Sequence, residues 1–251
     1  MADENKRGSD IRRITVSRLD NKTGLFVKTG YEINVLPHET VLDALIRIKE
    51  IKDRTLSVRY SCRMGICGSC GMVINGKPSL ACQTQVSHLK GDITVSPMLG
   101  HPVIRDLIND FGFFFHKHKS VHPWIIAGDA NADKFSPKHT TKQKSENVEE
   151  LLPFSSCINC GLCLDACPVA NSDPDFIGPQ ALAQAQRFNL DSRDKGREER
   201  SLIISGGEGI WGCEFIGACS KVCPKGVDPA LAIQELKIEA MKKSLGMKKR
   251  A

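Results

Sequence analysis

The stretch SCRMGICGSCGMVINGKPSLAC, residues 61–82, decides the first half of the fold because it contains four cysteines in a diagnostic spacing. Four residues separate the first two cysteines, two the next pair, and eleven the last pair, which is typical of plant-type [2Fe–2S] sites. Glycines between the cysteines let the backbone wrap closely around a cluster. Structural zinc is disfavoured, because it usually takes two separated C-x-x-C pairs. The sequence therefore predicts a [2Fe–2S] cluster on Cys62, Cys67, Cys70 and Cys82.

A second block, CINCGLCLDACP at residues 157–168, has the bacterial ferredoxin spacing C-x2-C-x2-C-x3-C-P. In such runs the fourth cysteine binds the other cluster of a pair. The partner run is CEFIGACSKVCP at residues 213–224, which has Ile216 where a complete run has its second cysteine. An aliphatic side chain cannot bind iron, so this run has one ligand too few for two complete cubanes.

The crossing of fourth cysteines predicts the ligands of two further clusters. A [4Fe–4S] cluster is expected on Cys157, Cys160, Cys163 and Cys223. Three thiolates and an apolar fourth wall favour a [3Fe–4S] cluster on Cys167, Cys213 and Cys219. This division uses all eleven cysteines of the chain.

Length, charge and the absence of export signals narrow the class of protein. The 251 residues suffice for two modest domains, and eleven cysteines in a reducing compartment favour metal over disulfides. The formal charge of +6 would be nearly cancelled by cluster thiolates, which disfavours nucleic-acid binding. The start MADENKRGSD lacks a signal peptide, and no apolar run reaches the roughly 20 residues of a membrane span.

Apolar periodicity predicts a small sheet followed by helices. Residues 11–35 alternate as a hairpin, Thr40 caps a helix, and further strands are expected near residues 72–75 and 92–95. From Val103 the spacing becomes helical, so we expect an N-terminal domain at 1–104 and a helical domain at 105–251.

Within the second half, residues 128–150 are expected to form a loop. Helices are expected to start at Pro179 and, capped by Asp228, at Pro229. The histidines lack ligand spacing, and His116 and His118 are expected at a surface or interface.

With these motifs in this order, the chain resembles the iron–sulfur subunits of succinate dehydrogenase and fumarate reductase. The resemblance covers essentially the whole chain and includes the segments HPVIRDL, KSVHPW, DFIGPQAL, RFNLDSRD and CSKVCPKG. It implies an α+β architecture, with a plant-type ferredoxin β-grasp domain followed by an all-α bacterial-ferredoxin-like domain.

The resemblance also implies a function. The chain would relay single electrons between an FAD-containing flavoprotein subunit, acting on succinate or fumarate, and quinone or haem at a membrane-anchor subunit. It would bind no FAD itself and would lie peripherally on the cytoplasmic face of the cell membrane. An alternative is the iron–sulfur subunit of a soluble thiol-driven fumarate reductase or of a complex like heterodisulfide reductase.

Overall fold

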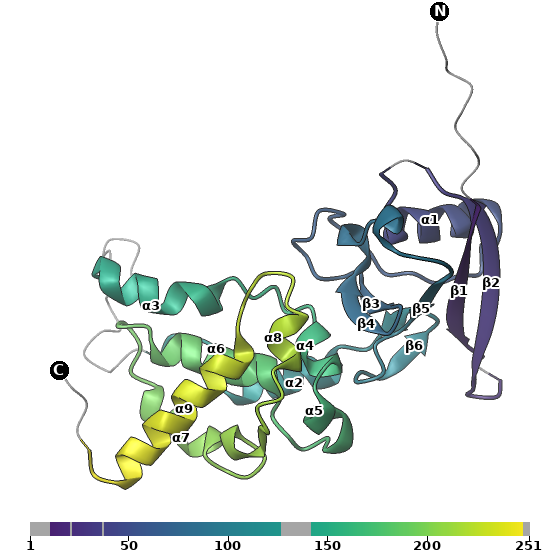
Figure 1. Ribbon diagram of the computed structural model, residues 1–251. Helices are drawn as coiled ribbons and strands as arrows, with labels where there is room; N and C mark the ends of the chain where they lie inside the picture. The colour runs from purple at the N-terminus through teal and green to yellow at the C-terminus, as the bar shows by residue number, and fades with distance from the viewer. Residues whose placement is uncertain (1–10, 21, 37, 127–141, 248–251) are drawn as a thin grey trace, which may run out of the picture. The chain divides into compact units, whose positions relative to one another are not determined.

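The computed structural model describes residues 11–20, 22–36, 38–126 and 142–247. The chain divides into two compact units, Met1–Asp110 and Phe111–Ala251. Figure 1 shows strands gathered in the first unit and helices in the second. This division confirms the α+β architecture expected from the sequence. The N-terminal ten residues and most of the expected loop at 128–150 lie outside the described residues.

The first unit is built on a five-stranded sheet with the order β2-β1-β5-β3-β4. Strands β1 (Ile11–Leu19) and β2 (Phe26–Asn34) form the antiparallel hairpin predicted from alternation. Strand β5 (Ile93–Ser96) pairs in parallel with β1 and antiparallel with β3 (Gly71–Ile74). Strand β4 (Lys77–Leu80) pairs antiparallel with β3 at the sheet edge.

Helix α1 (Val41–Ile51) begins at the predicted capping box. Thr40 Oγ1 accepts a hydrogen bond from the Asp43 backbone N–H at 3.2 Å, and Asp43 Oδ2 accepts one from the Thr40 N–H at 3.1 Å. One face of the helix is apolar and fully buried against the unit's core, as its spacing of apolar residues requires. Two short 3₁₀ turns, Ala81–Gln83 and Val86–His88, follow the strand β4.

The prediction of a helix from Val103 is wrong at its start. Residues 103–109 instead form a small hairpin of β6 (Val103–Arg105) and β7 (Ile108–Asn109). The side chain of Asn109 is buried and bridges the backbone of Met98, donating to its carbonyl at 2.7 Å and accepting from its N–H at 3.2 Å. These contacts with a residue outside the segment outweigh the local helical spacing of apolar side chains.

An ion pair ties the β6–β7 turn to the first unit. Arg18 Nε donates to Asp106 Oδ1 at 3.1 Å, and Asp106 is 2% exposed. Arg18 Nη1 also contacts Asp53 Oδ2 at 2.6 Å, at the end of α1. The first compact unit therefore extends to residue 110, six residues beyond the boundary placed after residue 104 from the sequence.

The second unit is helical, with short helices next to the cysteine runs and longer ones around them. Its elements are α2 (Gly112–Ser120), α3 (Ser145–Ser155), α4 (Leu162–Asp165), α5 (Pro168–Ser172), α6 (Pro179–Asn189), α7 (Arg197–Ile204), the 3₁₀ turn Ile210–Gly212, α8 (Ala218–Lys221) and α9 (Pro229–Ser244). The predicted starts of α6 and α9 are confirmed, whereas α3 occupies part of the segment expected as a loop.

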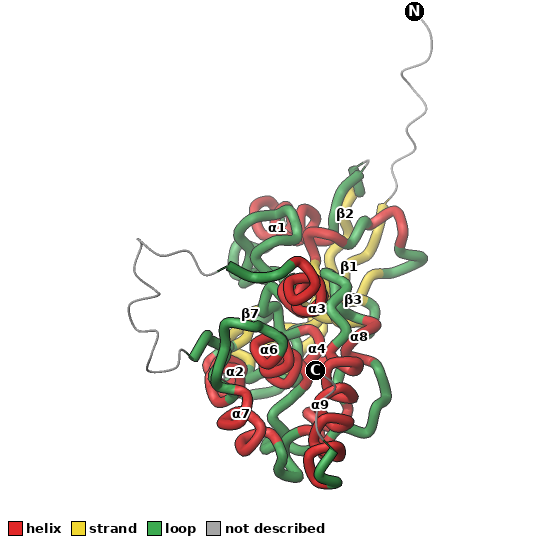
Figure 2. Tube along the Cα trace, turned by 90° about the vertical axis from the view of Figure 1, so that its left-hand side faces the viewer, coloured by secondary structure: helices red, strands yellow, loops and turns green. Residues whose placement is uncertain are grey.

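Helix α6 lies at the centre of this unit and contacts α2, α3, α4, α7 and α9. Figure 2 shows α6 with α2 and α3 near it, seen down the helix. Its small side chains, Ala181, Ala183 and Ala185, are buried and let the neighbouring helices approach closely. No helix in the described parts of the chain is long and apolar enough to cross a membrane.

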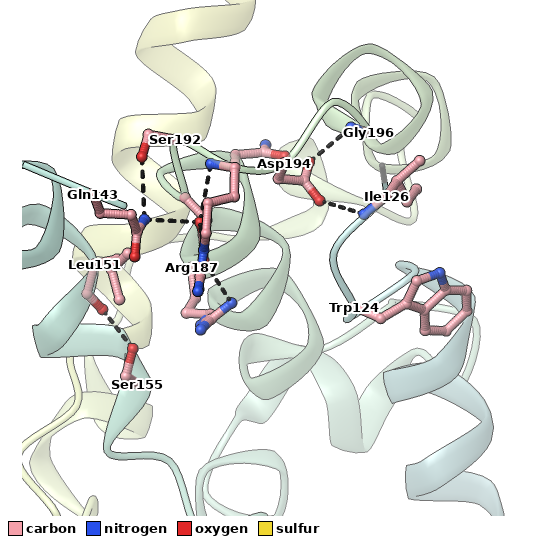
Figure 3. A network of polar contacts seen from close by, with 12 residues as sticks. Trp124, Ile126, Gln143, Leu151, Ser155, Arg187, Ser192, Asp194 and Gly196 are labelled. Atoms are coloured by element: carbon pink, nitrogen blue, oxygen red, sulfur yellow. Dashed lines mark hydrogen bonds and ion pairs between the residues drawn. The ribbon is translucent and has the colours of Figure 1, made fainter. Parts of the chain in front are cut away.

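A buried polar network binds the loop after α6 to neighbouring backbone segments. Asp194 accepts hydrogen bonds from the backbone N–H groups of Ile126 at 2.9 Å and Gly196 at 2.7 Å (Figure 3). Arg200, which is 0% exposed, forms a bidentate pair with Asp194 at 2.7 and 2.6 Å. It also donates to the carbonyls of His122 and Trp124 at 3.0 and 2.9 Å, so one guanidinium joins three segments.

Candidate iron–sulfur centres

The first centre comprises Cys62, Cys67, Cys70 and Cys82, on the loop before β3 and the 3₁₀ turn after β4. The Cys62 sulfur accepts hydrogen bonds from the backbone N–H groups of Met64, Ile66 and Cys67 at 3.5, 3.3 and 3.3 Å. A hydrogen bond of 3.1 Å from the Ala81 N–H to the Cys70 carbonyl brings the two segments together.

Glycine is strongly favoured at position 65 of this loop. Gly65 has a φ of +70°, and a Cβ there would lie 2.2 Å from the Gln83 amide nitrogen. The wrapped loop aims several N–H groups at sulfur, and such donors stabilise a negatively charged thiolate. The donor set therefore fits a cluster with anionic sulfur ligands.

The second centre is a hollow of about 400 Å³ in the second unit. It is lined by four cysteines from both runs, Cys157, Cys160, Cys163 and Cys223. The rest of its wall is mainly apolar, including Ile158, Leu162 and Val227, with Gln180 and Lys225 as the polar and charged members. The structure thus brings together the four cysteines that the crossing rule assigned to the [4Fe–4S] cluster.

The third centre is a neighbouring hollow of about 350 Å³, lined by Cys167, Cys213 and Cys219. Ile216 lies in its wall and is 51% exposed. The Cys213 carbonyl accepts a hydrogen bond of 2.7 Å from Lys237 Nζ, on α9. Three cysteines and an isoleucine therefore meet here, as the sequence suggested.

The backbones of the two cysteine runs repeat each other. In the first run, Asn159 and Gly161 have φ values of +53° and +78° on either side of Cys160. In the second run, Phe215 and Gly217 have φ values of +57° and +75° on either side of Ile216. Ile216 therefore occupies the backbone position of a ligand without being able to serve as one.

Burial controls the ionisation of these thiols when no metal is bound. It raises the pKa of Cys160 to about 11 and raises that of Cys163 well above the usual value. At the first centre burial also raises the pKa of Cys70 to about 12. For Cys67, burial is outweighed by hydrogen bonds from Ser69 and the Cys62 N–H, which lower its pKa to about 6. Binding of cationic iron would displace the thiol protons.

The arrangement of donors distinguishes a cluster from a single ion. Among the described residues, no three His, Cys, Asp or Glu side chains are placed to hold one metal ion. Instead, the cysteines of the second and third centres are spread around the walls of two hollows. Soft sulfur ligands around such a space fit an iron–sulfur core better than tetrahedral zinc.

Polar residues around the second centre were missed in the sequence analysis. Gln180 is polar but only 4% exposed, because it lies on the buried face of α6 beside Ala181 and Leu182. Its amide contacts His118, which was expected at a surface or interface and is partly buried here. The sequence did contain one sign of this contact, namely a glutamine among the apolar residues of one helix face.

Comparison with known protein families gives two matches. Residues 13–116 match the 2Fe-2S iron-sulfur cluster binding domain, and residues 153–227 match the 4Fe-4S dicluster domain. Each match contains the corresponding cysteines, which accords with the geometry of the three centres.

Similar proteins match over most of their length. The chain is 48% identical to the fumarate reductase iron-sulfur subunit of Mycobacterium tuberculosis over 212 residues, covering 84% of this chain and 85% of that protein. Identity to the Haemophilus influenzae fumarate reductase iron-sulfur subunit is 42%, with 84% and 86% covered. Identity to the Paracoccus denitrificans succinate dehydrogenase iron-sulfur subunit is 37%, with 91% and 88% covered.

A solved structure also resembles the whole chain. A chain of the Mycobacterium smegmatis Sdh1 complex in the apo form superimposes with a TM-score of 0.84 at 26% identity. The similarity covers 95% of this chain and 98% of that one.

Proposed function

This chain belongs to the family of iron–sulfur subunits of succinate dehydrogenases and fumarate reductases, and from that premise we propose how its cysteines divide among three clusters. It is an electron-transfer subunit of an oxidoreductase complex and carries 2Fe–2S and 4Fe–4S domains. When bound, such clusters accept and pass on one electron at a time. The polypeptide holds the clusters, shields them from water and sets the electrostatics around them.

The ligand assignment follows the three centres. The first centre holds [2Fe–2S] and the second holds [4Fe–4S]. The observation that carries the assignment is that each hollow of the second unit is lined by cysteines from both cysteine runs. Cys223 joins the three cysteines of the first run, while Cys167 joins those of the second run.

The third centre holds a [3Fe–4S] cluster in this proposal. A cubane needs a ligand at each iron, and the residue beside the three cysteines that could face a fourth iron is Ile216, which cannot bind it. The matching backbone at Cys160 and Ile216 supports this assignment, because Ile216 stands at a ligand position without a ligand side chain. No other cysteine is left to replace it, because the remaining eight are used by the first two centres.

The partners proposed for the chain are an FAD-containing flavoprotein subunit and a membrane-anchor subunit. Electrons pass between the flavoprotein and the [2Fe–2S] cluster at one end, and between the [3Fe–4S] cluster and quinone or haem of the anchor at the other. Around the third centre, Trp211, Phe215 and Ile216 are 46%, 59% and 51% exposed. Large apolar side chains exposed together favour burial against a partner, and we assign this surface to the anchor at the cytoplasmic face of the membrane.

Two substitutions test the crossing of ligands. Cys223→Ser should remove the [4Fe–4S] signal in electron paramagnetic resonance (EPR) while leaving the oxidised [3Fe–4S] signal. Cys167→Ser should do the reverse, and each variant serves as the control for the other. If Cys223→Ser instead removed the [3Fe–4S] signal, the ligands would not cross and the assignment would be wrong.

Isolation of the complex tests the partners. Membranes solubilised in mild detergent should yield this chain together with a flavin-containing subunit and a hydrophobic anchor. Recovery from the soluble fraction with a cysteine-rich disulfide reductase would instead support a thiol-driven complex.

A further inference from the structure

A chain of polar side chains runs from a cysteine of the second centre to helix α2. Asn159 Oδ1 lies 3.5 Å from Cys157 Sγ and 2.9 Å from Gln180 Nε2. Gln180 Nε2 in turn lies 3.0 Å from His118 Nδ1. The residues come from the first cysteine run, the first turn of α6 and α2, so this contact chain is built by tertiary structure alone.

With a protonated thiol and the amide orientations of this structure, each hydrogen bond in the chain has a defined donor and acceptor. The Cys157 S–H donates to Asn159 Oδ1, and the two N–H groups of Gln180 donate to Asn159 and to His118 Nδ1. His118 Nδ1 then accepts and carries no proton. This pattern requires a protonated Cys157 thiol.

A thiolate that binds iron reverses the direction, because it can only accept hydrogen bonds. Turning a side-chain amide by 180° exchanges its oxygen and nitrogen at nearly the same positions. Asn159 then donates an N–H to the sulfur, and Gln180 Oε1 accepts from Asn159. The second lone pair of Gln180 Oε1 accepts from His118 Nδ1–H. Each of the three hydrogen bonds then has one donor and one acceptor, provided that His118 carries a proton on Nδ1.

The reversed chain links the charge of the cluster to the charge of His118. A reduced cluster is more negative, which strengthens the donor bond from Asn159 and favours positive charge at the far end. Burial lowers the pKa of His118, and the bond to Gln180 acts against that effect. The imidazolium is therefore favoured when an electron is present on the cluster and disfavoured when it is absent.

The other charged groups near His118 are exposed, as His116 and Lys119 are, or bind other partners. On α2 the ionisable neighbours are His116, Lys117 and Lys119. The Lys117 ammonium binds the carbonyls of Pro174 and Phe176, with Asp173 and Asp175 nearby in that loop. On α6 the one ionisable side chain is Arg187, about two turns from Gln180. The ring of Phe115 contacts His118 at 6.4 Å between centroids.

We propose that Asn159, Gln180 and His118 form a relay that raises the potential of the [4Fe–4S] cluster and couples its reduction to protonation of His118. One electron, supplied by a neighbouring cluster or by dithionite in the test, goes to the cluster. One proton from solvent goes to Nε2 of His118, while Nδ1–H continues to donate to Gln180. The inference rests on the proposed assignment of Cys157 and its three companions to this cluster.

The test is a redox titration of the [4Fe–4S] EPR signal in the intact complex from about pH 5.5 to 8.5. The wild-type midpoint should fall as pH rises, approaching about 59 mV per unit where one proton accompanies one electron. Gln180→Leu should stabilise the reduced form three- to tenfold less, a downward shift of roughly 30–60 mV, and flatten the pH dependence. The control is Gln184→Leu, one turn further along α6, which should leave the midpoint and its pH dependence unchanged.

A conservative change at His118 separates the hydrogen bond from the proton. His118→Asn keeps an N–H donor near the Nδ1 position but cannot titrate. It should lose the pH dependence, whereas His116→Asn on the same helix should retain it.

The outcomes distinguish the relay from the ligand assignment beneath it. A wild-type [4Fe–4S] signal whose midpoint does not change with pH would overturn the relay and leave the cluster assignment intact. Retention of the wild-type slope in His118→Asn would have the same meaning. Absence of a [4Fe–4S] signal from the wild-type complex would overturn the assignment and the relay together. The wild-type series decides the matter even if Gln180→Leu fails to assemble.

Discussion

Replacing Ile216 with cysteine should convert the third cluster from [3Fe–4S] to [4Fe–4S]. The backbone on either side of Ile216 already matches that around Cys160, and Ile216 lies in the wall of the hollow. A thiolate at this position can therefore reach the fourth corner without a change in the loop. The complex should gain one iron atom per chain, from about nine to about ten.

The same change should lower the potential of the third cluster. An oxidised [4Fe–4S] core already contains ferrous iron, so adding an electron is harder than in an all-ferric [3Fe–4S] core. A fall in midpoint potential on the order of 100 mV corresponds to a roughly fifty-fold smaller equilibrium constant for reduction, since about 59 mV corresponds to a tenfold change. Electron delivery to quinone should slow, while reduction of the flavin by succinate continues.

Iron analysis and EPR of the air-oxidised and dithionite-reduced complex measure both effects. Ile216→Ala is the matched control, because it changes the same wall without adding a ligand and should keep the oxidised [3Fe–4S] signal. If Ile216→Cys kept that signal and the iron content unchanged, position 216 would not face the cluster. The proposed geometry of the third centre would then be refuted.

Three further outcomes are expected. Arg200→Met should destabilise the second unit by about 3–5 kcal/mol, because it leaves the buried Asp194 carboxylate without its charged partner. Arg197→Met breaks a partly exposed ion pair and should cost about 0–1 kcal/mol. The free energies of unfolding of the two variants are compared by following the loss of cluster absorbance in denaturant. Hydrogen bonds, first from Thr55, lower the pKa of Asp53 to about 2, so its contribution is present above about pH 4 and is lost as pH falls toward 2. The melting temperature of the first unit should fall over this pH range, and the fall should be smaller in Asp53→Asn. The isolated chain should bind no FAD and oxidise no succinate, because it lacks a strand–glycine–helix dinucleotide motif; flavin fluorescence and succinate-dependent dye reduction would reveal either activity.

The sequence predicts elements well where local chemistry determines them. The capping box at Thr40 and the aspartate cap at Asp228 each place a helix start correctly. The cysteine spacings similarly identify both cluster-binding domains, because ligand geometry strongly restricts the loop. The crossing of Cys167 and Cys223 between hollows follows from the same restriction.

The errors arise where distant contacts outweigh local patterns. Residues 103–109 have helical apolar spacing, but Asp106 binds the side chain of Arg18, 88 residues away, and Asn109 binds the backbone of Met98, 11 residues away. Helix α3 has few apolar residues and contains Pro153, and it forms by docking Leu151 and Phe154. Neither effect has a signature within a short window of sequence.

The polar environment of the second centre was hidden for a related reason. His118 looks like one of several exposed residues on α2, and its partner Gln180 is 62 residues away. Only the packing of α2 on α6 brings the two together. Residues that contact cluster ligands through another side chain cannot be found from ligand spacing.

The central claim is that eleven cysteines hold three different clusters in one chain. EPR of the intact complex, with iron analysis on the same sample, tests it most directly. We predict a [2Fe–2S] and a [4Fe–4S] signal after reduction with dithionite, a [3Fe–4S] signal after oxidation in air, and about nine iron atoms per chain. An oxidised sample without the [3Fe–4S] signal and with about four iron atoms per chain would contradict the account.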